Sequence, residues 1–146
     1  MSRLYPSLPI VGVGAVVVRG QRVLIVRRAN PPLQGEWSIP GGALDLGEKL
    51  CDGVAREVLE ETGLQVEVGP VVEVLDSIFP DGEGRTAYHY VLIDYLCHAP
   101  SGEAKAGTDA SELRWASLEE LPALGMRPVT IEVIGKALAM SAEGWK

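Results

Sequence analysis

The feature that most restricts the fold is a change of periodicity at residues 48–62, where the chain passes from strand-like to helical spacing. Residues four apart lie on one side of a helix, and mostly apolar side chains recur at that spacing: Leu50, Val54, Val58 and Thr62. Gly63 follows at the position where a left-handed residue commonly ends a helix. We therefore expect one amphipathic helix whose apolar side packs on a sheet formed by the flanking segments.

The opposite side of this expected helix is acidic near its C-terminal end. It carries Asp52 and Arg56 together with three glutamates, Glu57, Glu60 and Glu61. Their i, i+3 and i+4 spacing brings the glutamates within about 6 Å of one another along the axis. Like charges at such spacings cost roughly 0.2–0.5 kcal/mol each, and a helix C-terminus favours cations instead. This placement indicates that something else compensates for the repulsion.

Runs of β-branched residues mark strands on both sides of the helix. The runs 10–18 and 23–27 flank Arg19-Gly20-Gln21-Arg22 and predict a hairpin. The other expected elements are a short segment at 37–39, strands at 65–79 (bent at Gly69-Pro70), 87–97 and 112–115, a capping box at 117–120 and a closing helix at 129–140. No repeat or linker interrupts them, so we expect one domain over residues 1–146. The order of elements predicts an α/β or α+β fold, with helices covering a mixed sheet.

Charge and hydropathy exclude several classes of protein. Lys plus Arg number 13 and Asp plus Glu number 20, so the net charge is −7, which argues against nonspecific nucleic-acid binding. This acidity is compatible with a phosphate substrate if a divalent cation lies between the charges. No run reaches the ~18–20 apolar residues that cross a bilayer, and prolines and glycines interrupt the apolar N-terminal segment. We expect a cytoplasmic protein without membrane contact, with Cys51 and Cys97 as buried free thiols.

The expected helix and the loop before it form a motif with fixed spacing. Gly42 is followed by five residues and Glu48, then after seven residues by Arg56-Glu57-Val58, Glu60-Glu61 and Gly63-Leu64. This matches the pattern G-x5-E-x7-R-E-U-x-E-E-x-G-U, with U a bulky aliphatic residue, at every specified position. The chain therefore resembles the Nudix hydrolase family of the MutT-like superfamily. The lead-in WSIPGG at 37–42 and the flanking elements are similar to the family too, so the resemblance covers almost the whole chain.

The resemblance implies a fold and a chemistry. Members have an α/β/α sandwich with a mixed β-sheet and a loop-helix-loop at the motif. They hydrolyse a nucleoside diphosphate linked to another group, using Mg²⁺ or Mn²⁺. The implied metal ligands are Gly42, through its carbonyl, and Glu57, Glu60 and Glu61; the cation would relieve their repulsion. Arg56 is expected to orient the cluster through Glu60 and Glu48.

The motif does not identify the general base. Within it, Glu57 and Glu61 are both candidates. Outside it, the leading candidate is Glu112 in the segment 109–115, with an ordinary surface glutamate as the alternative.

Residues outside the motif are expected to bind the substrate. Guanidinium groups suit phosphate oxygens, which makes Arg27, Arg28 and Arg85 candidates; solvated surface arginines are the alternative. Phe79 is a candidate platform for the base, as are Trp37, Tyr88 and Tyr90. Core packing is the alternative for each aromatic side chain.

Substrate identity is predicted from features beyond the motif. Pro80, sixteen residues past Leu64, matches a mark of the ADP-ribose pyrophosphatase branch, which the segments 88–97, 102–107 and 112–115 also resemble. We expect hydrolysis of ADP-ribose to AMP and ribose 5-phosphate. The alternatives are a MutT-type (d)NTP pyrophosphohydrolase that releases pyrophosphate, and a non-catalytic nucleotide-sensing module. The expected partner is a small-molecule nucleotide rather than nucleic acid, and a homodimer is a further expectation because dimers are common in the family.

Overall fold

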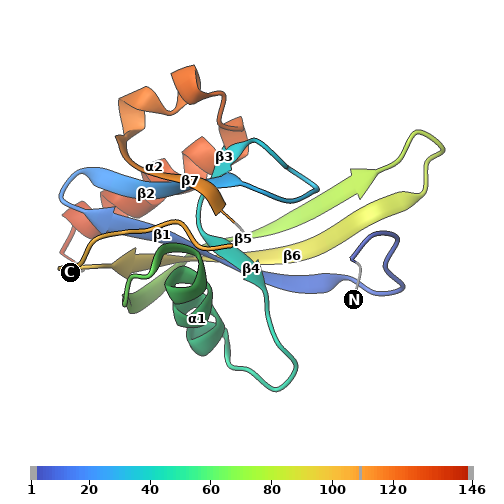
Figure 1. The fold of residues 1–146 in the computed structure, drawn as a ribbon, viewed down its shortest axis with the longest axis horizontal. Coiled ribbons are helices and arrows are strands. Elements are labelled where there is room, and N and C mark those ends of the chain that lie inside the picture. Colours follow the sequence, from blue (N-terminus) through green and yellow to red (C-terminus); the bar gives the residue numbers. More distant parts are fainter. Residues whose placement is uncertain (1–2, 109, 145–146) are drawn as a thin grey trace.

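The computed structural model describes residues 3–108 and 110–144, which form a seven-stranded mixed sheet with a helix on each face (Figure 1). Helix α1 (Leu50–Thr62) covers one face and helix α2 (Pro128–Ala142) covers the other. The strands are β1 (Ile10–Arg19), β2 (Arg22–Arg28), β3 (Trp37–Ser38), β4 (Gly41–Ala43), β5 (Glu67–Pro80), β6 (Thr86–His98) and β7 (Ala110–Ser117). The predicted arrangement of helices over a mixed sheet is confirmed.

The central strand of the sheet is β1. The order is β3-β2-β1-β6-β5, while β4 also pairs with β1 and β7 with β2. β1 and β6 are parallel, and the other pairs are antiparallel. Side chains alternate along β1: Val13, Ala15 and Val17 join the core under α1, whereas Val16 and Val18 join the core under α2. Burial on both faces explains why β1 is an almost unbroken run of small and β-branched residues.

Helix α1 forms where the sequence predicts, with Val54 and Val58 buried against the sheet. Two side chains differ from expectation: Glu61 is only 4% exposed, and Leu59 is 48% exposed. The reason is the helical repeat, since position 61 lies seven residues after Val54 and falls on the same side as Val54 and Val58. Burial of Glu61 brings its carboxylate toward β4.

The cysteines are both free, as expected, but only one is buried. Cys97 lies in the core under α1, whereas Cys51 is exposed in the first turn of α1. The expectation of two buried thiols is therefore wrong for Cys51.

Strands β1 and β2 separate beyond their hairpin, and β4 lies in the space between them. β1 pairs with β2 only near the turn, at Val18↔Val23 and Arg19↔Arg22. Further along, Gly12, Val13 and Gly14 pair with Ala43, Gly42 and Gly41. A Cβ at Gly41 would lie 2.9 Å from the Cα of Gly14, so this close approach requires glycine. It places the start of the motif directly beside the central strand.

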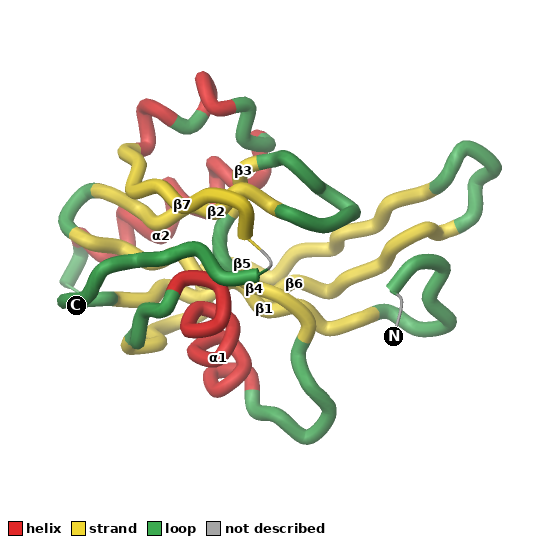
Figure 2. Tube along the Cα trace, viewed as in Figure 1, coloured by secondary structure: helices red, strands yellow, loops and turns green. Residues whose placement is uncertain are grey.

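The remaining elements agree with the sequence in kind and differ in length. β5 and β6 form a long hairpin that extends away from both helices (Figure 2), and their register shifts between Val68 and Val71, at the predicted bend. β7 is longer than predicted because it pairs along the whole of β2. Ser117 and Glu120 form the predicted capping box of the 3₁₀ helix η1 (Leu118–Glu120), which precedes η2 (Pro122–Leu124). Within residues 3–108 and 110–144, no helix has the length and apolarity needed to span a bilayer.

Replacing Gly63 with Ala is expected to lower the free energy of unfolding by about 1 kcal/mol, because Gly63 ends α1 at φ 75°. Apart from chain neighbours, no described atom lies within 4 Å of a Cβ built there, so the loss comes from the backbone conformation alone. Gly82→Ala is the matched control, since Gly82 has equal space and no positive φ. Urea denaturation measures both variants, and equal effects would contradict the prediction.

Candidate active site

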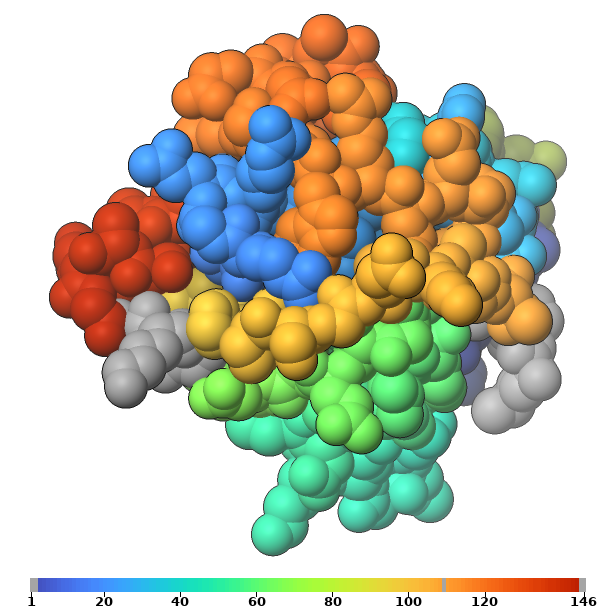
Figure 3. Space-filling view, turned by 60° about the vertical axis from the view of Figure 1, so that its left-hand side comes forward, coloured from blue at the N-terminus to red at the C-terminus, as the bar shows by residue number. Residues whose placement is uncertain are grey.

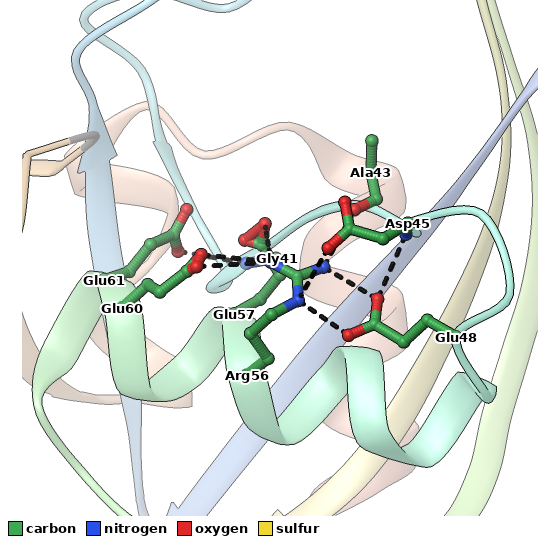
Figure 4. Close-up of polar contacts among 8 residues, drawn as sticks. All are labelled: Gly41, Ala43, Asp45, Glu48, Arg56, Glu57, Glu60 and Glu61. Carbon is green, nitrogen blue, oxygen red and sulfur yellow. Dashed lines mark hydrogen bonds and ion pairs between the residues drawn. The ribbon is translucent and has the colours of Figure 1, made fainter.

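Arg56 is the centre of a carboxylate network where the motif loop meets α1 (Figure 4). Its Nε and Nη2 donate to the two carboxylate oxygens of Glu48 at 2.7 and 2.9 Å. Its Nη1 donates to Glu57 at 3.3 Å and to Glu60 at 3.0 Å. Nη2 also donates to the carbonyl of Ala43 at 3.1 Å. The guanidinium thus ties the loop to the helix, and the predicted contacts of Arg56 with Glu48 and Glu60 are confirmed.

This pairing fixes the charge state of Glu48. Hydrogen bonds from Arg56, and then from the N–H of Asp45, lower the pKa of the Glu48 carboxyl to about 2. Pairing with Glu48 in turn raises the pKa of Arg56. Both groups therefore stay ionised at neutral pH, and the bidentate geometry holds the guanidinium in one orientation.

The three glutamates of α1, here called the acidic ridge (Glu57, Glu60 and Glu61), have different surroundings. The side chain of Glu57 is 13% exposed, and a Cβ at Gly42 would lie 2.6 Å from its carboxyl carbon. Glu60 is 54% exposed. The buried Glu61 accepts a hydrogen bond from the N–H of Gly41 at 3.0 Å. The two glycines of β4 let the backbone approach the ridge closely.

Glu57 and Glu61 line a cavity of about 310 Å³, which we call the first cavity. Its other walls include Arg28 at the end of β2, Asn30 in the following loop, and Tyr88 and Tyr90 on β6. Glu57 and Glu61 are therefore accessible to a ligand from a side that also presents a cation, whereas Glu60 of the ridge does not line this cavity.

Two more cavities continue from the first, and the three together are here called the trough. The second cavity, of about 120 Å³, shares five lining residues with the first: Arg3, Arg28, Gly41, Gly42 and Tyr90. The third, of about 200 Å³, shares with the second Ile39, Phe79, Leu92 and Asp94. The trough thus extends from the acidic ridge to the N-terminal end of α2, where Val129 and Thr130 line it.

Arg28 occupies the junction of the first and second cavities. Its Nε is buried and has no hydrogen-bond partner within the part of the chain that the structure describes. A buried donor without a partner is costly, and such groups commonly bind something else. The unpaired Nε leaves a charged donor available to an acceptor atom of a ligand at this point of the trough.

Asp94 on β6 is a trough residue that the sequence did not single out. It is 5% exposed and lines the second and third cavities. Burial, and to a smaller extent the charge of Glu73, raises its pKa to about 6. The one available signal was an isolated acid in the otherwise apolar stretch 91–97.

The other predicted site residues lie in different places. Phe79 lines the second and third cavities, with the ring of Tyr88 edge-on at 6.3 Å. Arg27 and Glu112 form an ion pair at 3.0 Å, and neither lines the trough. Arg85 pairs with Asp81 at 3.1 Å in the turn between β5 and β6. Roles for Arg27, Arg85 and Glu112 stay predictions.

The loop between β6 and β7 supports the end of α1, along which it runs (Figure 3). The N–H of Lys105 donates to the carbonyl of Thr62, and that of Gly107 to the carbonyl of Glu61, both at 2.8 Å. No Cβ fits at Gly107, because it would overlap the carbonyl oxygen of Glu60. These hydrogen bonds satisfy terminal carbonyls of the helix and reduce the partial negative charge beside the acidic ridge.

Among the described residues, no three acidic, histidine or cysteine side chains are arranged as a ready-made metal site. The hydrogen bonds explain this, since Arg56 holds Glu57 and Glu60 while Gly41 holds Glu61. The donors themselves have the right chemistry, because Mg²⁺ prefers carboxylate and carbonyl oxygens. Glu57, Glu61 and Gly42 also line one cavity. The residues present therefore fit a hard divalent cation.

Asp94→Asn is expected to become more stabilising, relative to wild type, as pH rises from 4 to 7. The folded-state pKa of about 6 lies above the ordinary 3.8, so the folded protein binds the extra proton between these values and loses stability as Asp94 ionises. The rise in the pKa of Asp94 corresponds to a change of roughly 3 kcal/mol in the free energy of unfolding across this pH range. Denaturant unfolding of both proteins at each pH measures it, with the exposed Asp52→Asn as the control. A stability difference that stays constant with pH would contradict this prediction.

Comparison with known proteins gives the family. A model of the NUDIX domain matches residues 8–135. The chain is 36% identical over 122 residues to the ADP-ribose pyrophosphatase of Methanocaldococcus jannaschii, covering 84% of this chain and 69% of that protein. It is also 36% identical over 111 residues to the putative 8-oxo-dGTP diphosphatase 2 of Mycobacterium tuberculosis, covering 75% and 74%. The crystal structure of a MutT NUDIX hydrolase from Burkholderia pseudomallei matches with a TM-score of 0.77 and 33% identity, covering 89% of this chain and 98% of that one. With its intact motif and its mixed sheet between two helices, this chain belongs to the Nudix hydrolase family.

Proposed function

We propose that this Nudix hydrolase cleaves the diphosphate bond of a nucleoside diphosphate linked to another group, and that it converts ADP-ribose to AMP and ribose 5-phosphate. The observation that carries the proposal is the first cavity, which has the carboxylates of Glu57 and Glu61 on one wall and Arg28 on another. A diphosphate requires both kinds of group: donors for its oxygens, and a place for the cation that accompanies it.

The residues that would hold Mg²⁺ or Mn²⁺ are Glu57, Glu60, Glu61 and the carbonyl of Gly42. When bound, such a cation neutralises charge on the diphosphate and activates water at neutral pH. The closeness of the Glu57 carboxylate to Gly42 supports this assignment, since both would face one ion.

The chain's own residues divide the remaining work. Arg56 is a positioning residue that fixes Glu57 and Glu60 relative to the motif loop. Arg28 binds phosphate oxygens through the Nε that otherwise lacks a partner. Water attacks one phosphorus, and its proton passes to Glu57 or Glu61, both of which line the first cavity. The bond from that phosphorus to the bridging oxygen breaks, and the second phosphate leaves.

Two substrate classes are supported to different degrees. ADP-ribose is favoured by Pro80 and by the archaeal relative whose name is ADP-ribose pyrophosphatase. A (d)NTP pyrophosphohydrolase is the second candidate, because a relative named as a putative 8-oxo-dGTP diphosphatase has the same identity. A non-catalytic sensor is disfavoured because every specified residue of the motif is present.

Incubation of the purified protein with Mg²⁺ and ADP-ribose, dNTPs or dinucleoside polyphosphates tests this proposal. The expected result is release of AMP and ribose 5-phosphate from ADP-ribose, with product identity determined by chromatography. Release of pyrophosphate from dNTPs alone would favour the second candidate. Ligand binding without any turnover would favour the sensor.

Glu60→Gln and Glu61→Gln are each expected to lower kcat by roughly 100-fold or more, because cation binding contributes several kcal/mol to the transition state. Neither variant should unfold, because Gln retains an acceptor for the N–H of Gly41 at position 61 and for Nη1 of Arg56 at position 60, and each change relieves charge repulsion on the ridge. Steady-state kinetics with Mg²⁺ and melting in EDTA measure the two effects. The exposed Glu67→Gln is the control, and normal turnover in both ridge variants would remove the assignment.

Arg28→Met is expected to raise KM for ADP-ribose by about tenfold or more, as the loss of a charge-assisted hydrogen bond predicts. Arg27→Met should raise KM less, because Glu112 and the carbonyl of Gly35 already hold the Arg27 guanidinium. The two arginines are adjacent on β2, so the comparison keeps charge and strand position constant. A larger increase in KM for Arg27→Met than for Arg28→Met would assign phosphate binding to Arg27 instead of Arg28.

Cellular location and assembly stay predictions from the sequence. We propose a cytoplasmic enzyme that acts on small-molecule nucleotides, not on nucleic acid, and forms a homodimer. Size-exclusion chromatography with light scattering measures the assembly directly.

A further inference from the structure

The trough changes character along its length. Its first cavity is lined mainly by polar and charged groups, among them Arg28, Asn30, Glu57 and Glu61. The second is lined mainly by apolar side chains: Val13, Pro32, Leu33, Ile39, Phe79 and Leu92. A ligand with a charged part and a flat apolar part matches this division.

Asp94 is an exception within the apolar part. The residue is 95% buried, and none of the hydrogen bonds found within residues 3–108 and 110–144 involves its carboxylate, whose oxygens stay open to the trough instead of being fully enclosed. A buried carboxylate is strongly disfavoured unless something donates to it. Since Asp94 lines both the second and third cavities, the missing donor belongs in the trough.

The neighbouring strand leaves space for this carboxylate. Asp94 pairs in register with Gly14 on β1, where a Cβ would overlap the Oδ1 of Asp94 and lie 3.1 Å from Ile39. Charged neighbours lie near it: Glu73 pairs with Asp94 from β5, Arg3 and Arg28 line the second cavity, and Arg127 and Asp76 line the third. The backbone thus accommodates a carboxylate here, and the side chain points into the trough.

We propose that Asp94 is the specificity-determining residue of a nucleobase subsite and accepts a hydrogen bond from the exocyclic amino group of a purine. This inference rests on the proposed function, since it places the base of the nucleotide beyond the diphosphate. An ionised carboxylate only accepts hydrogen bonds, and the amino groups of adenine and guanine are donors at the edge of an aromatic ring. The walls around Asp94 favour the base over the ribose, because a flat ring can contact Phe79 and the aliphatic side chains while its edge reaches the acid.

Two pairs of nucleoside monophosphates test Asp94 without requiring turnover. AMP and purine riboside 5′-monophosphate differ only in the 6-amino group, and GMP and IMP differ only in the 2-amino group. We expect wild type, titrated by calorimetry with Mg²⁺, to prefer the amino-bearing member of at least one pair by about tenfold or more. In Asp94→Ala the members of that pair should bind within about twofold of each other.

Two further variants complete the design. Asp94→Asn keeps one acceptor oxygen without the charge, and the ratio of its affinities for the two members of the pair should be at least threefold smaller than in wild type. This variant replaces Asp94→Ala if Asp94→Ala does not fold. Asp52→Asn removes an exposed carboxylate from the first turn of α1 and should keep the full preference.

Several outcomes would overturn the proposal. These are equal binding within both pairs by wild type, no binding of any monophosphate, or an unchanged preference in the Asp94 variants. Wild type could instead bind 2′-deoxy-AMP more weakly than AMP, with that difference in affinity abolished by Asp94→Ala. This result would assign Asp94 to the ribose and also overturn the nucleobase proposal. If the protein does not hydrolyse ADP-ribose but still prefers the amino-bearing monophosphate, the proposed substrate is wrong and the role of Asp94 stands. If it hydrolyses ADP-ribose but shows no preference for the amino-bearing monophosphate, the role of Asp94 is wrong and the proposed substrate stands.

Discussion

The bidentate ion pair of Arg56 with Glu48 is the interaction on which the site depends. It anchors a helix side chain to the preceding loop, and the same guanidinium then reaches Glu57, Glu60 and the carbonyl of Ala43. Without Arg56, the partly buried carboxylates of Glu48 and Glu57 would each lose a partner, which is far more costly than the loss of an exposed pair. The network also resolves the unfavourable cluster of acids at the end of α1. Arg56 offsets part of the charge, and the β6–β7 loop satisfies helix carbonyls beside it.

Local patterns made much of the fold predictable. The four-residue repeat from Leu50 to Thr62 and the glycine after it located α1, and the β-branched runs located the hairpin of β1 and β2. The mixed sheet with helices over it also followed from the order of elements. Contacts four or eight residues apart, such as Arg56 with Glu60 and Glu48, depend on helix geometry and short loops, so the sequence reveals them. Glu61 shows the limit of that reasoning, because its polar character suggested solvent while its position in the repeat buried it.

The substrate side of the site was much less predictable. Arg28 and Arg27 are adjacent and chemically identical, yet only Arg28 lines the trough, because side chains alternate along β2 and Glu112 of the neighbouring β7 pairs with Arg27. Asp94 acquires its setting from residues far away in the chain: Gly14 of β1, Phe79 of β5 and Ile39 between β3 and β4 come near it only after the sheet has formed. Such neighbourhoods depend on strand order and register, which no short motif encodes.

The two ends of the trough belong to opposite sides of the sheet. The acidic ridge lies on α1, whereas Asp94 alternates with the residues that face α1 and shares its cavity with Val129 and Thr130 of α2. Under the roles proposed above, different layers of the protein shape bond cleavage and base recognition. A substitution in the α2 layer can therefore reshape the far end of the trough without contacting the acidic ridge.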